Sequence, residues 1–597
     1  MTDQPELNDT DLDAVREKYR VERDKRLEGS SRAVVVPDFT GPGAEYLVDP
    51  YQPVVEREPV NDEVDVVIVG AGFGGLLFGA NLRDEGMQRI RLIDTAGDVG
   101  GVWYWNRYPG AMCDVESLIY MPLLEELGYV PKDRYAKAAE ILAHAKKLAK
   151  HYGLYDDALF HTAVTELRWD DEEGHWLVTT NRGDQIRALH VLVAPGPLNR
   201  LRLPDLPGLD SFKGRVFHTS RWDYSYTGGD SESELTGLRD KAVGIVGTGA
   251  TGLQCVPQVA KYAKQLYVFQ RTPSTVAVRD NRPIDPEWVK SQQPGWQARR
   301  QDNFTDVLAG VPVDEDLVHD SWTDLYNHLL YDPAFAELSP DAAAKLREIA
   351  DFNQMESVRS RIATEVADPQ TAEALKPYYA YTCKRPGFHD EYLASFNRPN
   401  VTLVDTQGQG LEAAYRDGVI VNGEKYELDC LILATGFSTE TAGRGMLGYE
   451  VVGRDGLTLN EKWAGGLSTL HGIATSRFPN FFLMPGNYSQ SAGTVNLMHA
   501  MQHHAKQVAY IIGEATRRGA RVVEVDPEAE AAWVQTILDK APDRKEFLAA
   551  CTPGRDNYEG ANTRPAQNAL YGGTPREYFE ILEKWRQAGD LAGFRLS

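Results

Sequence analysis

The chain has 597 residues, with 42% hydrophobic and 25% charged side chains and a formal net charge of −24. These proportions are typical of a globular protein with two or three domains, and they exclude a disordered or fibrous chain. The acidic balance argues against a nucleic-acid partner, which needs a basic face, and the lack of an apolar run of about 18 residues predicts that no segment enters a membrane.

The first 60 residues are expected to form an extension ahead of the first domain. Their start is acidic and polar where a signal peptide would be basic and then apolar, so we expect a cytoplasmic protein. Apolar residues recur at helical spacing over residues 11–27, which predicts a surface helix. The Pro- and Gly-bearing segment 36–59 predicts an irregular arm.

A buried parallel strand is predicted at residues 64–70, where the sequence VDVVIVG is almost uninterrupted in its apolar character. Gly70, Gly72 and Gly75 follow at the spacing of a dinucleotide-binding turn, in which backbone N–H groups and a helix N-terminus face a pyrophosphate. Asp94 lies 24 residues after Gly70, at the end of the next strand. Its carboxylate can accept hydrogen bonds from ribose and would repel a 2′-phosphate.

The same unit recurs at AVGIVGTGATGLQCVPQVA, with Gly247, Gly249 and Gly252. The residue 24 positions after the first of these glycines is Arg271, whose guanidinium can pair with a 2′-phosphate. Opposite charges at the two adenosine ends predict one FAD site and one NADPH site, brought together for hydride transfer.

The predicted fold is α/β, with two Rossmann-like dinucleotide-binding domains interleaved along the chain. A third apolar strand at residues 430–436 and a Pro-punctuated linker at residues 201–209 support this organisation. Helical patterns recur at residues 527–541 and 575–588. We predict an N-terminal extension (1–60), a FAD-binding domain in two parts (61–205 and 389–515), an NADP-binding domain (206–388) with a helical insertion at about 280–380, and a C-terminal region (516–597).

The cysteines are far apart in the sequence, so their spacing indicates neither a CxxC redox pair nor a zinc-ligand cluster. We therefore expect reduced thiols and no bound metal. The five residues are Cys113, Cys255, Cys383, Cys430 and Cys551.

Two further segments combine glycines with aromatic residues. Residues 100–114, here named the aromatic segment, read GGVWYWNRYPGAMCD and match [A/G]GxWxxxx[F/Y]P[G/M]xxxD. Residues 212–223 match FxGxxxHxxxW[P/D] through Gly214, His218 and Trp222. Both patterns are signatures of type I Baeyer–Villiger monooxygenases, which the chain resembles over about residues 61–515. Its C-terminal tail, with CTPGRDNYEG at residues 551–560 and YGGTPREYFEILEKW at residues 571–585, resembles the branch that acts on macrocyclic, steroid-like or polycyclic terpenoid ketones.

This resemblance implies an FAD- and NADPH-dependent enzyme that inserts one oxygen atom of O2 beside the carbonyl of a large cyclic ketone. An ester or lactone would form through a C4a-peroxyflavin and a Criegee adduct, and such anions need a fixed cation in a dry site. The resemblance implies that Arg385 is this cation, that Asp114 positions it, and that Lys384 joins Arg271 at the 2′-phosphate. It implies a structural or hinge role for His218 and its signature.

Further positions follow from the same resemblance. Pro195 and Pro197 stand where relatives have small or polar residues before the linker, which predicts altered domain rotation. Trp463, Tyr488 and Met498 are predicted to line the ketone pocket. The remaining predicted contacts are Gly101, Trp103, Met112, Cys113, Tyr120 and Val164 for FAD, and Thr248, Ala250, Thr251, Gln254 and Thr272 for NADP.

Three alternatives stay open on the sequence. A flavin N- or S-oxygenating monooxygenase shares both glycine motifs, although Trp222, Asp223 and Arg385 favour ketone oxidation. A disulfide reductase shares the fold plan, but it needs a dithiol that these cysteines supply only if distant ones meet. A non-catalytic NADPH-sensing flavoprotein is disfavoured by the presence of Arg385 and Asp114. As partners we expect a ketone and O2, and either a monomer or a homodimer.

Overall fold

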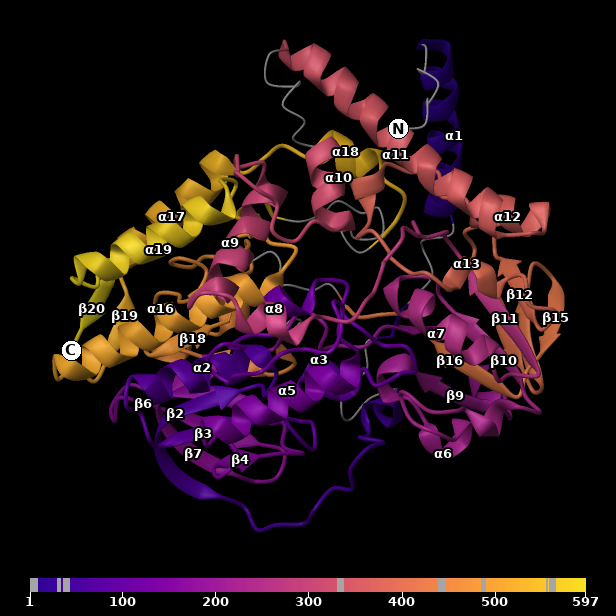
Figure 1. Cartoon of the computed structure of the whole chain (residues 1–597). Coiled ribbons are helices and arrows are strands. Elements are labelled where there is room, and N and C mark those ends of the chain that lie inside the picture. The colour runs from indigo at the N-terminus through magenta and orange to yellow at the C-terminus, as the bar shows by residue number, and fades with distance from the viewer. Residues whose placement is uncertain are drawn as a thin grey trace.

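The computed structural model describes residues 9–28, 34–35, 43–329, 338–438, 447–484, 490–554, 557 and 565–597. Two helix-covered sheets lie at the lower left and right of Figure 1, and longer helices pack above them. Among these helices is α1 (Asp9–Glu28), which contains the helix predicted near the N-terminus. Arg16 of α1 forms an ion pair with Glu348 of α11 (Pro340–Glu365). The N-terminal extension is thereby attached to the upper helices.

The first sheet is built around β2 (Asn61–Val69), whose buried residues Val66, Val67 and Ile68 agree with the predicted strand. β2 runs directly into α2 (Phe73–Asp84), which packs against the long helix α16 (Leu497–Arg517). The strand order is β17-β5-β6-β7-β2-β3-β4, with β18 beside β7. The other bounds are β3 (Ile90–Ile93), β4 (Ala158–Leu159), β5 (Val164–Asp170), β6 (His175–Thr180), β7 (Gln185–Val193), β17 (Glu450–Val452) and β18 (Phe481–Leu483).

The second sheet is parallel throughout, in the order β12-β11-β10-β16-β9. β10 (Ala242–Val246) carries the second glycine motif into α7 (Ala250–Ala260). The predicted domain boundary at residue 388 was set too early, because β12 and β16 pair with this sheet and the chain returns to the first sheet only at β17. The other bounds are β9 (Arg215–His218), β11 (Gln265–Gln270), β12 (Val401–Asp405) and β16 (Cys430–Leu433).

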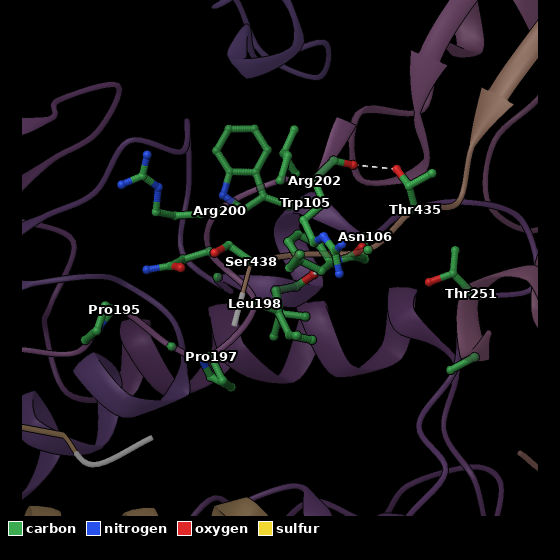
Figure 2. Close-up of a pocket in the computed structure, with 18 of the residues that line it drawn as sticks. Trp105, Asn106, Pro195, Pro197, Leu198, Arg200, Arg202, Thr251, Thr435 and Ser438 are labelled. Carbon is green, nitrogen blue, oxygen red and sulfur yellow. Dashed lines mark hydrogen bonds between the residues drawn. The ribbon is translucent and has the colours of Figure 1, made fainter. Parts of the chain in front are cut away.

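Two segments of chain connect the sheets and pair with each other. Leu201 forms a bridge with Phe437, and the N–H of Arg202 donates to the carbonyl of Gly436 at 3.0 Å. The hydroxyl of Thr435 donates to the carbonyl of Arg202, as the dashed line in Figure 2 marks. The linker predicted from its prolines is therefore one half of a two-stranded hinge.

Helices occupy the stretch where an insertion was predicted, and two long helices occupy the C-terminal region. Among the described residues, every helix is too short or too polar to cross a lipid bilayer. The insertion holds α8 (Pro286–Lys290), α9 (Trp296–Ala309), α10 (Ser321–Leu329), α11 and α12 (Pro369–Leu375). The C-terminal region holds β19 (Val523–Val525), α17 (Pro527–Lys540), α18 (Lys545–Ala550), α19 (Pro575–Ala588) and β20 (Phe594–Leu596). Smaller elements include α3 (Val102–Trp105), α4 (Ser117–Tyr120), α5 (Ala138–His151) and the small sheet β13 (Ala413–Tyr415), β14 (Gly418–Val421) and β15 (Glu424–Glu427).

Candidate active site

A cavity of about 1260 Å³ lies where the two sheets face each other. Its walls include both glycine turns, the aromatic segment, the hinge and the pair Lys384–Arg385. In Figure 2, Pro195, Pro197 and Leu198, which precede the hinge, are among the side chains that line it. The structure thus brings both predicted nucleotide turns to one cavity.

The first glycine turn presents uncapped backbone N–H groups to this cavity. Gly70 has a φ of 107°, and a Cβ there would lie 2.3 Å from the carbonyl oxygen of Ala194, so only glycine fits. Gly72 is the N-cap of α2, and no side chain caps this helix start. Its first-turn N–H groups are therefore left for an anion, as the pyrophosphate of a dinucleotide requires.

Asp94 lies directly after β3 at the cavity wall. Its Oδ2 accepts the N–H of Ala71 at 2.5 Å, and its Oδ1 accepts the N–H of Ala96 at 2.8 Å. Burial raises the pKa of Asp94, and these backbone donors offset only part of the rise. Each carboxylate oxygen has two lone pairs, so Asp94 can still accept a ribose hydroxyl.

The second glycine turn repeats the arrangement. Gly249 is the N-cap of α7, again without a side-chain cap. Arg271 lies directly after β11 and lines the cavity, and its own carbonyl accepts a hydrogen bond from Arg26 of α1 at 3.2 Å. Beside it, the buried hydroxyl of Thr272 has no hydrogen-bond partner among the described residues. A buried orphan hydroxyl in a cavity wall fits a group that meets a ligand.

Gln254 holds the aromatic segment against α7. Its Oε1 accepts the hydroxyl of Tyr108 at 2.8 Å, and its Nε2 donates to the carbonyl of Met112 at 3.0 Å. Trp103 of the same segment donates its Nε1 to the hydroxyl of Tyr120 at 2.9 Å, and both rings line the cavity. Since Gln254 belongs to the second domain and Tyr108 to the first, this contact joins the domains at the cavity.

The two residues predicted to be catalytic form an ion pair. Nε and Nη2 of Arg385 each donate to one carboxylate oxygen of Asp114 at 2.8 Å. Burial acts to raise the pKa of Asp114, but Arg385 and Arg279 hold it below its ordinary value. Burial acts to lower the pKa of Arg385, but Asp114 raises it on balance, so the guanidinium stays charged. The side chain of Arg385 is 38% exposed and lines the cavity, which leaves further N–H donors for a ligand.

Two residues that sequence reasoning missed support this pair. Trp322 of α10 donates its Nε1 to the carbonyl of Asp114 at 2.7 Å, and its ring centroid lies 4.8 Å from the guanidinium of Arg385. The buried Arg279 donates to the carbonyl of Cys113 at 2.5 Å. Neither residue stands in a motif, so no local signal could have identified it.

Comparison with known proteins places this site in a family. Residues 64–287 match the family described as pyridine nucleotide-disulphide oxidoreductase. The chain is 51% identical over 593 residues to pentalenolactone D synthase of Streptomyces arenae, covering 98% of this chain and 100% of that protein. It is 47% identical over 594 residues to a Baeyer–Villiger monooxygenase of Streptomyces coelicolor, with 98% and 96% covered. The solved polycyclic ketone monooxygenase of Thermothelomyces thermophila superposes with a TM-score of 0.91, 38% identity and 99% of both chains covered.

The chain belongs to the Baeyer–Villiger monooxygenase family. This membership confirms the predicted α/β fold with two Rossmann-like domains, the flavin monooxygenase class, and FAD and NADPH as the cofactors. It supports ketone oxygenation over both the N- or S-oxygenating and the NADPH-sensing alternatives.

In this Baeyer–Villiger monooxygenase, Gly214, His218 and Trp222 of the signature do not line the cavity. His218 is fully buried, its Nδ1 accepts the N–H of Ser220 at 3.2 Å, and burial lowers its pKa to about 3. The buried Trp222 donates its Nε1 to the hydroxyl of Thr227 at 3.0 Å. A neutral imidazole outside the cavity supports the predicted structural role of His218 and argues against acid–base catalysis.

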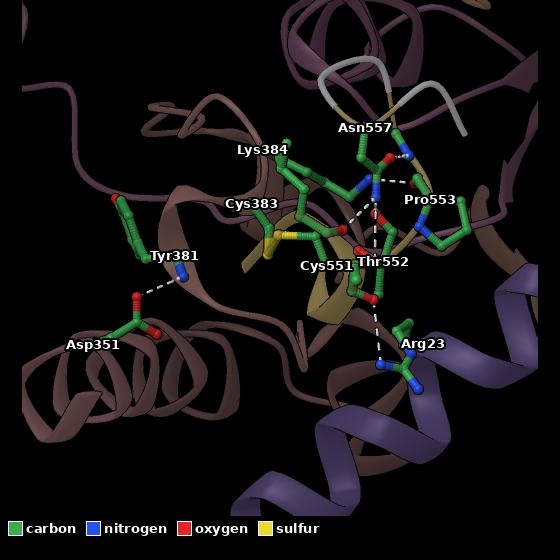
Figure 3. Close-up of a disulfide and its surroundings, with 12 residues drawn as sticks. Arg23, Asp351, Tyr381, Cys383, Lys384, Cys551, Thr552, Pro553 and Asn557 are labelled. Atoms are coloured by element: carbon green, nitrogen blue, oxygen red, sulfur yellow. Dashed lines mark hydrogen bonds between the residues drawn. A yellow bond between two sulfur atoms is a disulfide. The ribbon is translucent and has the colours of Figure 1, made fainter. Parts of the chain in front are cut away.

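A disulfide joins Cys383 to Cys551, which are 168 residues apart, directly before Lys384 (Figure 3). The expectation that all thiols are reduced is wrong for this pair, because the C-terminal region folds back onto the second domain. Distant cysteines therefore do meet, which was the condition for a disulfide reductase. Both lie outside the matched residues 64–287 and neither lines the cavity, so the bond does not supply that chemistry. Cys113, Cys255 and Cys430 are free and buried.

Lys384 lies between the cavity and the C-terminal region. Its Nζ donates to the carbonyl of Pro553 at 2.7 Å, as Figure 3 shows. It also lines the cavity together with Arg271. The predicted contact of Lys384 with the 2′-phosphate stays a prediction.

Most of the other predicted site residues line the cavity. Gly75 and Gly252 do not, because a Cβ at these positions would lie 1.8 and 2.3 Å from the carbonyls of Gly70 and Gly247, which places them where helix packs on strand. Trp463 was wrongly assigned to the pocket, since it is buried in the core of the first sheet, whereas Met498 does line the cavity. Tyr488 lies outside the described residues. The predicted residues that line the cavity are Gly70, Gly72, Asp94, Gly101, Trp103, Met112, Cys113, Asp114, Tyr120, Val164, Gly247, Thr248, Gly249, Ala250, Thr251, Gln254, Arg271, Thr272, Lys384 and Arg385.

Proposed function

We propose that this enzyme inserts an oxygen atom beside the carbonyl of a large polycyclic ketone and forms a lactone or ester, with Arg385 as the catalytic cation. The observation that supports this assignment is the ion pair of Arg385 with Asp114 in a cavity shared by both glycine turns. A permanent positive charge that is fixed in place and still has free donors suits a reaction whose intermediates are anionic.

The chain fits its two cofactors through separate sets of residues. Gly70, Gly72 and Asp94 would hold FAD, while Gly249 and Arg271 would hold NADPH. When bound, the cofactors supply the reducing equivalents and the activated oxygen. The protein contributes binding, orientation and charge at the place where the two sets of residues meet.

Arg385 acts on the ketone side of the reaction. Its free N–H groups donate to the oxygen that becomes negatively charged when the carbonyl is attacked. Asp114 stays ionised because its pKa is lowered on balance, so it cannot protonate this oxygen and instead fixes the guanidinium through two hydrogen bonds. Trp322 in turn holds the main chain of Asp114 through its carbonyl.

One part of the cavity wall is apolar. Val495, Leu497, Met498 and Met501 line it from the start of α16 and the residues just before it. Methionine side chains adapt to irregular apolar shapes, which suits a fused-ring substrate. The names of the relatives, pentalenolactone D synthase and polycyclic ketone monooxygenase, support a polycyclic ketone, with terpenoid, steroid and macrocyclic ketones as the classes to compare.

The test compares Arg385→Ala and Arg385→Lys with the wild type. Flavin reduction by NADPH is followed without oxygen, and ester or lactone formation is followed with oxygen over a panel of polycyclic, macrocyclic and simple cyclic ketones. Removing one hydrogen-bond donor that stabilises a developing oxyanion typically lowers kcat about 10²–10³-fold. We therefore expect Arg385→Ala to keep flavin reduction within about twofold and to lose product formation by at least that factor, with hydrogen peroxide released instead.

The rate of product formation by Arg385→Lys should lie between the rates of the wild type and Arg385→Ala, because lysine keeps the charge and loses the two-point contact with Asp114. Arg239→Ala, which removes an exposed arginine outside the cavity, is the control for a general effect of lost positive charge. Product formation by Arg385→Ala at the rate of the control would remove the catalytic assignment. If the enzyme converted only the simple cyclic ketones of the panel, the proposed substrate class would be wrong and the proposed reaction class would still hold.

A further inference from the structure

Two histidines of α16 and one aspartate of α9 form a cluster of possible metal ligands, and none of the three lines the cavity. His499 and His503 are separated by one helical turn on α16, and Asp302 faces them from α9. Their nearest ligand atoms all lie within 4.8 Å of one another. Two histidines at positions i and i+4 of one helix are a common arrangement for binding a metal ion.

The two separations from His499 to the other members of this cluster are those that a tetrahedral ion imposes, and the third is at most 4.8 Å. Nε2 of His499 lies 3.3 Å from Oδ1 of Asp302, and 3.3 Å from Nε2 of His503. Zinc binds histidine nitrogen and carboxylate oxygen at about 2.0–2.2 Å, and tetrahedral bonds of that length place neighbouring ligand atoms about 3.3–3.5 Å apart. Two imidazole nitrogens that face each other at 3.3 Å are already beyond the usual hydrogen-bond distance of about 2.7–3.2 Å.

Both imidazole rings are held in place by neighbouring side chains. Nδ1 of His499 lies 2.8 Å from the hydroxyl of Thr305, and a bond from Nδ1–H to this oxygen leaves the lone pair of Nε2 directed at the cluster. The ring of His503 stacks on Phe579 of α19, with centroids 3.9 Å apart and an angle of 3° between the planes. Arg576 forms its ion pair with the neighbouring Asp306 and interacts with Asp302 only through longer-range electrostatics.

We propose that Asp302, His499 and His503 form a binding site for one Zn²⁺ ion that joins α9 to α16. His499 is nearly buried, whereas the side chain of Asp302 is 43% exposed, so the fourth coordination position faces solvent and takes a water molecule. Two imidazoles and one carboxylate match the ligand preference of zinc.

This site would fix two walls of the active-site cavity relative to each other. Gln301 of α9 donates to the carbonyl of Ile119 at 2.7 Å and so holds the residue next to Tyr120, which lines the cavity. From α16, Met498 and Met501 line the same cavity. The ion would therefore stabilise the ketone-binding wall without touching the cofactors.

The test uses the FAD-loaded, full-length enzyme after treatment with a chelator and dialysis. Zn²⁺ is titrated against a chromophoric chelator, bound zinc is counted by elemental analysis after gel filtration, and the melting temperature is recorded with and without Zn²⁺. We expect one zinc ion per chain and a melting temperature that rises with Zn²⁺ concentration, because an ion that binds only the folded state stabilises it by mass action.

Asp302→Asn and His503→Gln should each weaken Zn²⁺ binding at least tenfold, and the double variant should lose both the stoichiometric ion and the thermal shift. Thr305→Val should weaken binding about 10–100-fold, since it removes the group that orients His499. His151→Gln, which changes an exposed histidine on α5, should behave as the wild type. Flavin content and circular dichroism test whether each variant is folded. Because Asp302 is partly exposed, Asp302→Asn should disturb the packing least. Equal uptake of Zn²⁺ by the wild type and the double variant, or no uptake by the wild type, would overturn the proposal.

Discussion

The disulfide between Cys383 and Cys551 makes a quantitative prediction about stability. The bond closes a loop of 168 residues between the second domain and the C-terminal region. In the chain-entropy model, cross-linking about 168 residues removes roughly 17 cal/mol/K of entropy from the unfolded chain, or about 5 kcal/mol at 25 °C, and measured disulfides typically contribute about 2–4 kcal/mol. Cys551→Ser, or reduction of the wild type, should therefore lower the free energy of unfolding by about 2–4 kcal/mol.

The assay has two parts, and one of them does not depend on stability. Thiols are counted in denatured protein that has not been reduced, where the wild type should show three and not five of its five cysteines, because one pair is bonded. Thermal unfolding of the FAD-loaded enzyme is then recorded with and without a thiol reductant. The melting temperature of the wild type should fall by several degrees on reduction, while that of Cys551→Ser should be low already and unaffected. Five titrating thiols, together with equal melting temperatures for both proteins, would refute the bond and this reasoning.

Three further predictions follow from the site. Asp114→Asn should lower kcat/KM for ketone oxygenation about 10–100-fold, since hydrogen bonds between charged groups contribute about 1.5–3 kcal/mol. In the assays described for Arg385→Ala, its anaerobic flavin reduction should stay within about twofold of the wild type. Arg271→Gln should raise KM for NADPH at least about tenfold and leave KM for NADH nearly unchanged in steady-state assays. The pKa of buried His218, about 3, lies below its unfolded value, so its contribution to stability is lost as the pH falls below about 6.5. His218→Gln should therefore reduce the slope of unfolding free energy against pH by about 1.4 kcal/mol per unit between about pH 4 and 6, measured by denaturant unfolding.

The two strand–glycine–helix turns could be predicted from the sequence because each is local. A buried strand, a glycine turn and a helix start follow one another within about 20 residues, and Asp94 and Arg271 each lie 24 positions from the first glycine of their motif. The physical demands of such a turn act over short stretches of chain, so they leave a pattern that one sequence can show. The pairing of Arg385 with Asp114 could not be predicted from the residues themselves, because the two positions are 271 apart in the sequence. The prediction came from the family resemblance.

The features that the sequence did not reveal all depend on long-range folding. Cys383 and Cys551 carry no spacing signal, and the five strands of the second sheet are separated in sequence by the helical insertion, which is why the boundary at residue 388 was set too early. Trp463 could not be told from a pocket residue, since an aromatic side chain has the same sequence signal in a core and in a cavity wall. The signal for the cluster of Asp302 with two histidines was present only in part, as the i and i+4 spacing of His499 and His503.

The contacts at the cavity indicate why the aromatic segment ends in an acidic residue. This segment belongs to the first domain, yet side chains of the second domain hold it at several points. Three of them are consecutive: Gln254 contacts Met112, Arg279 contacts Cys113, and Arg385 contacts Asp114. The first two contacts hold backbone groups, so they fix where the segment lies, and the third fixes a charge. Both segments of the two-stranded hinge also line this cavity. A rotation of one domain against the other about this hinge would therefore change all three contacts together. The position of the guanidinium proposed as the catalytic cation therefore depends on contacts between the two domains, and Asp114 is the residue that joins Arg385 to the aromatic segment.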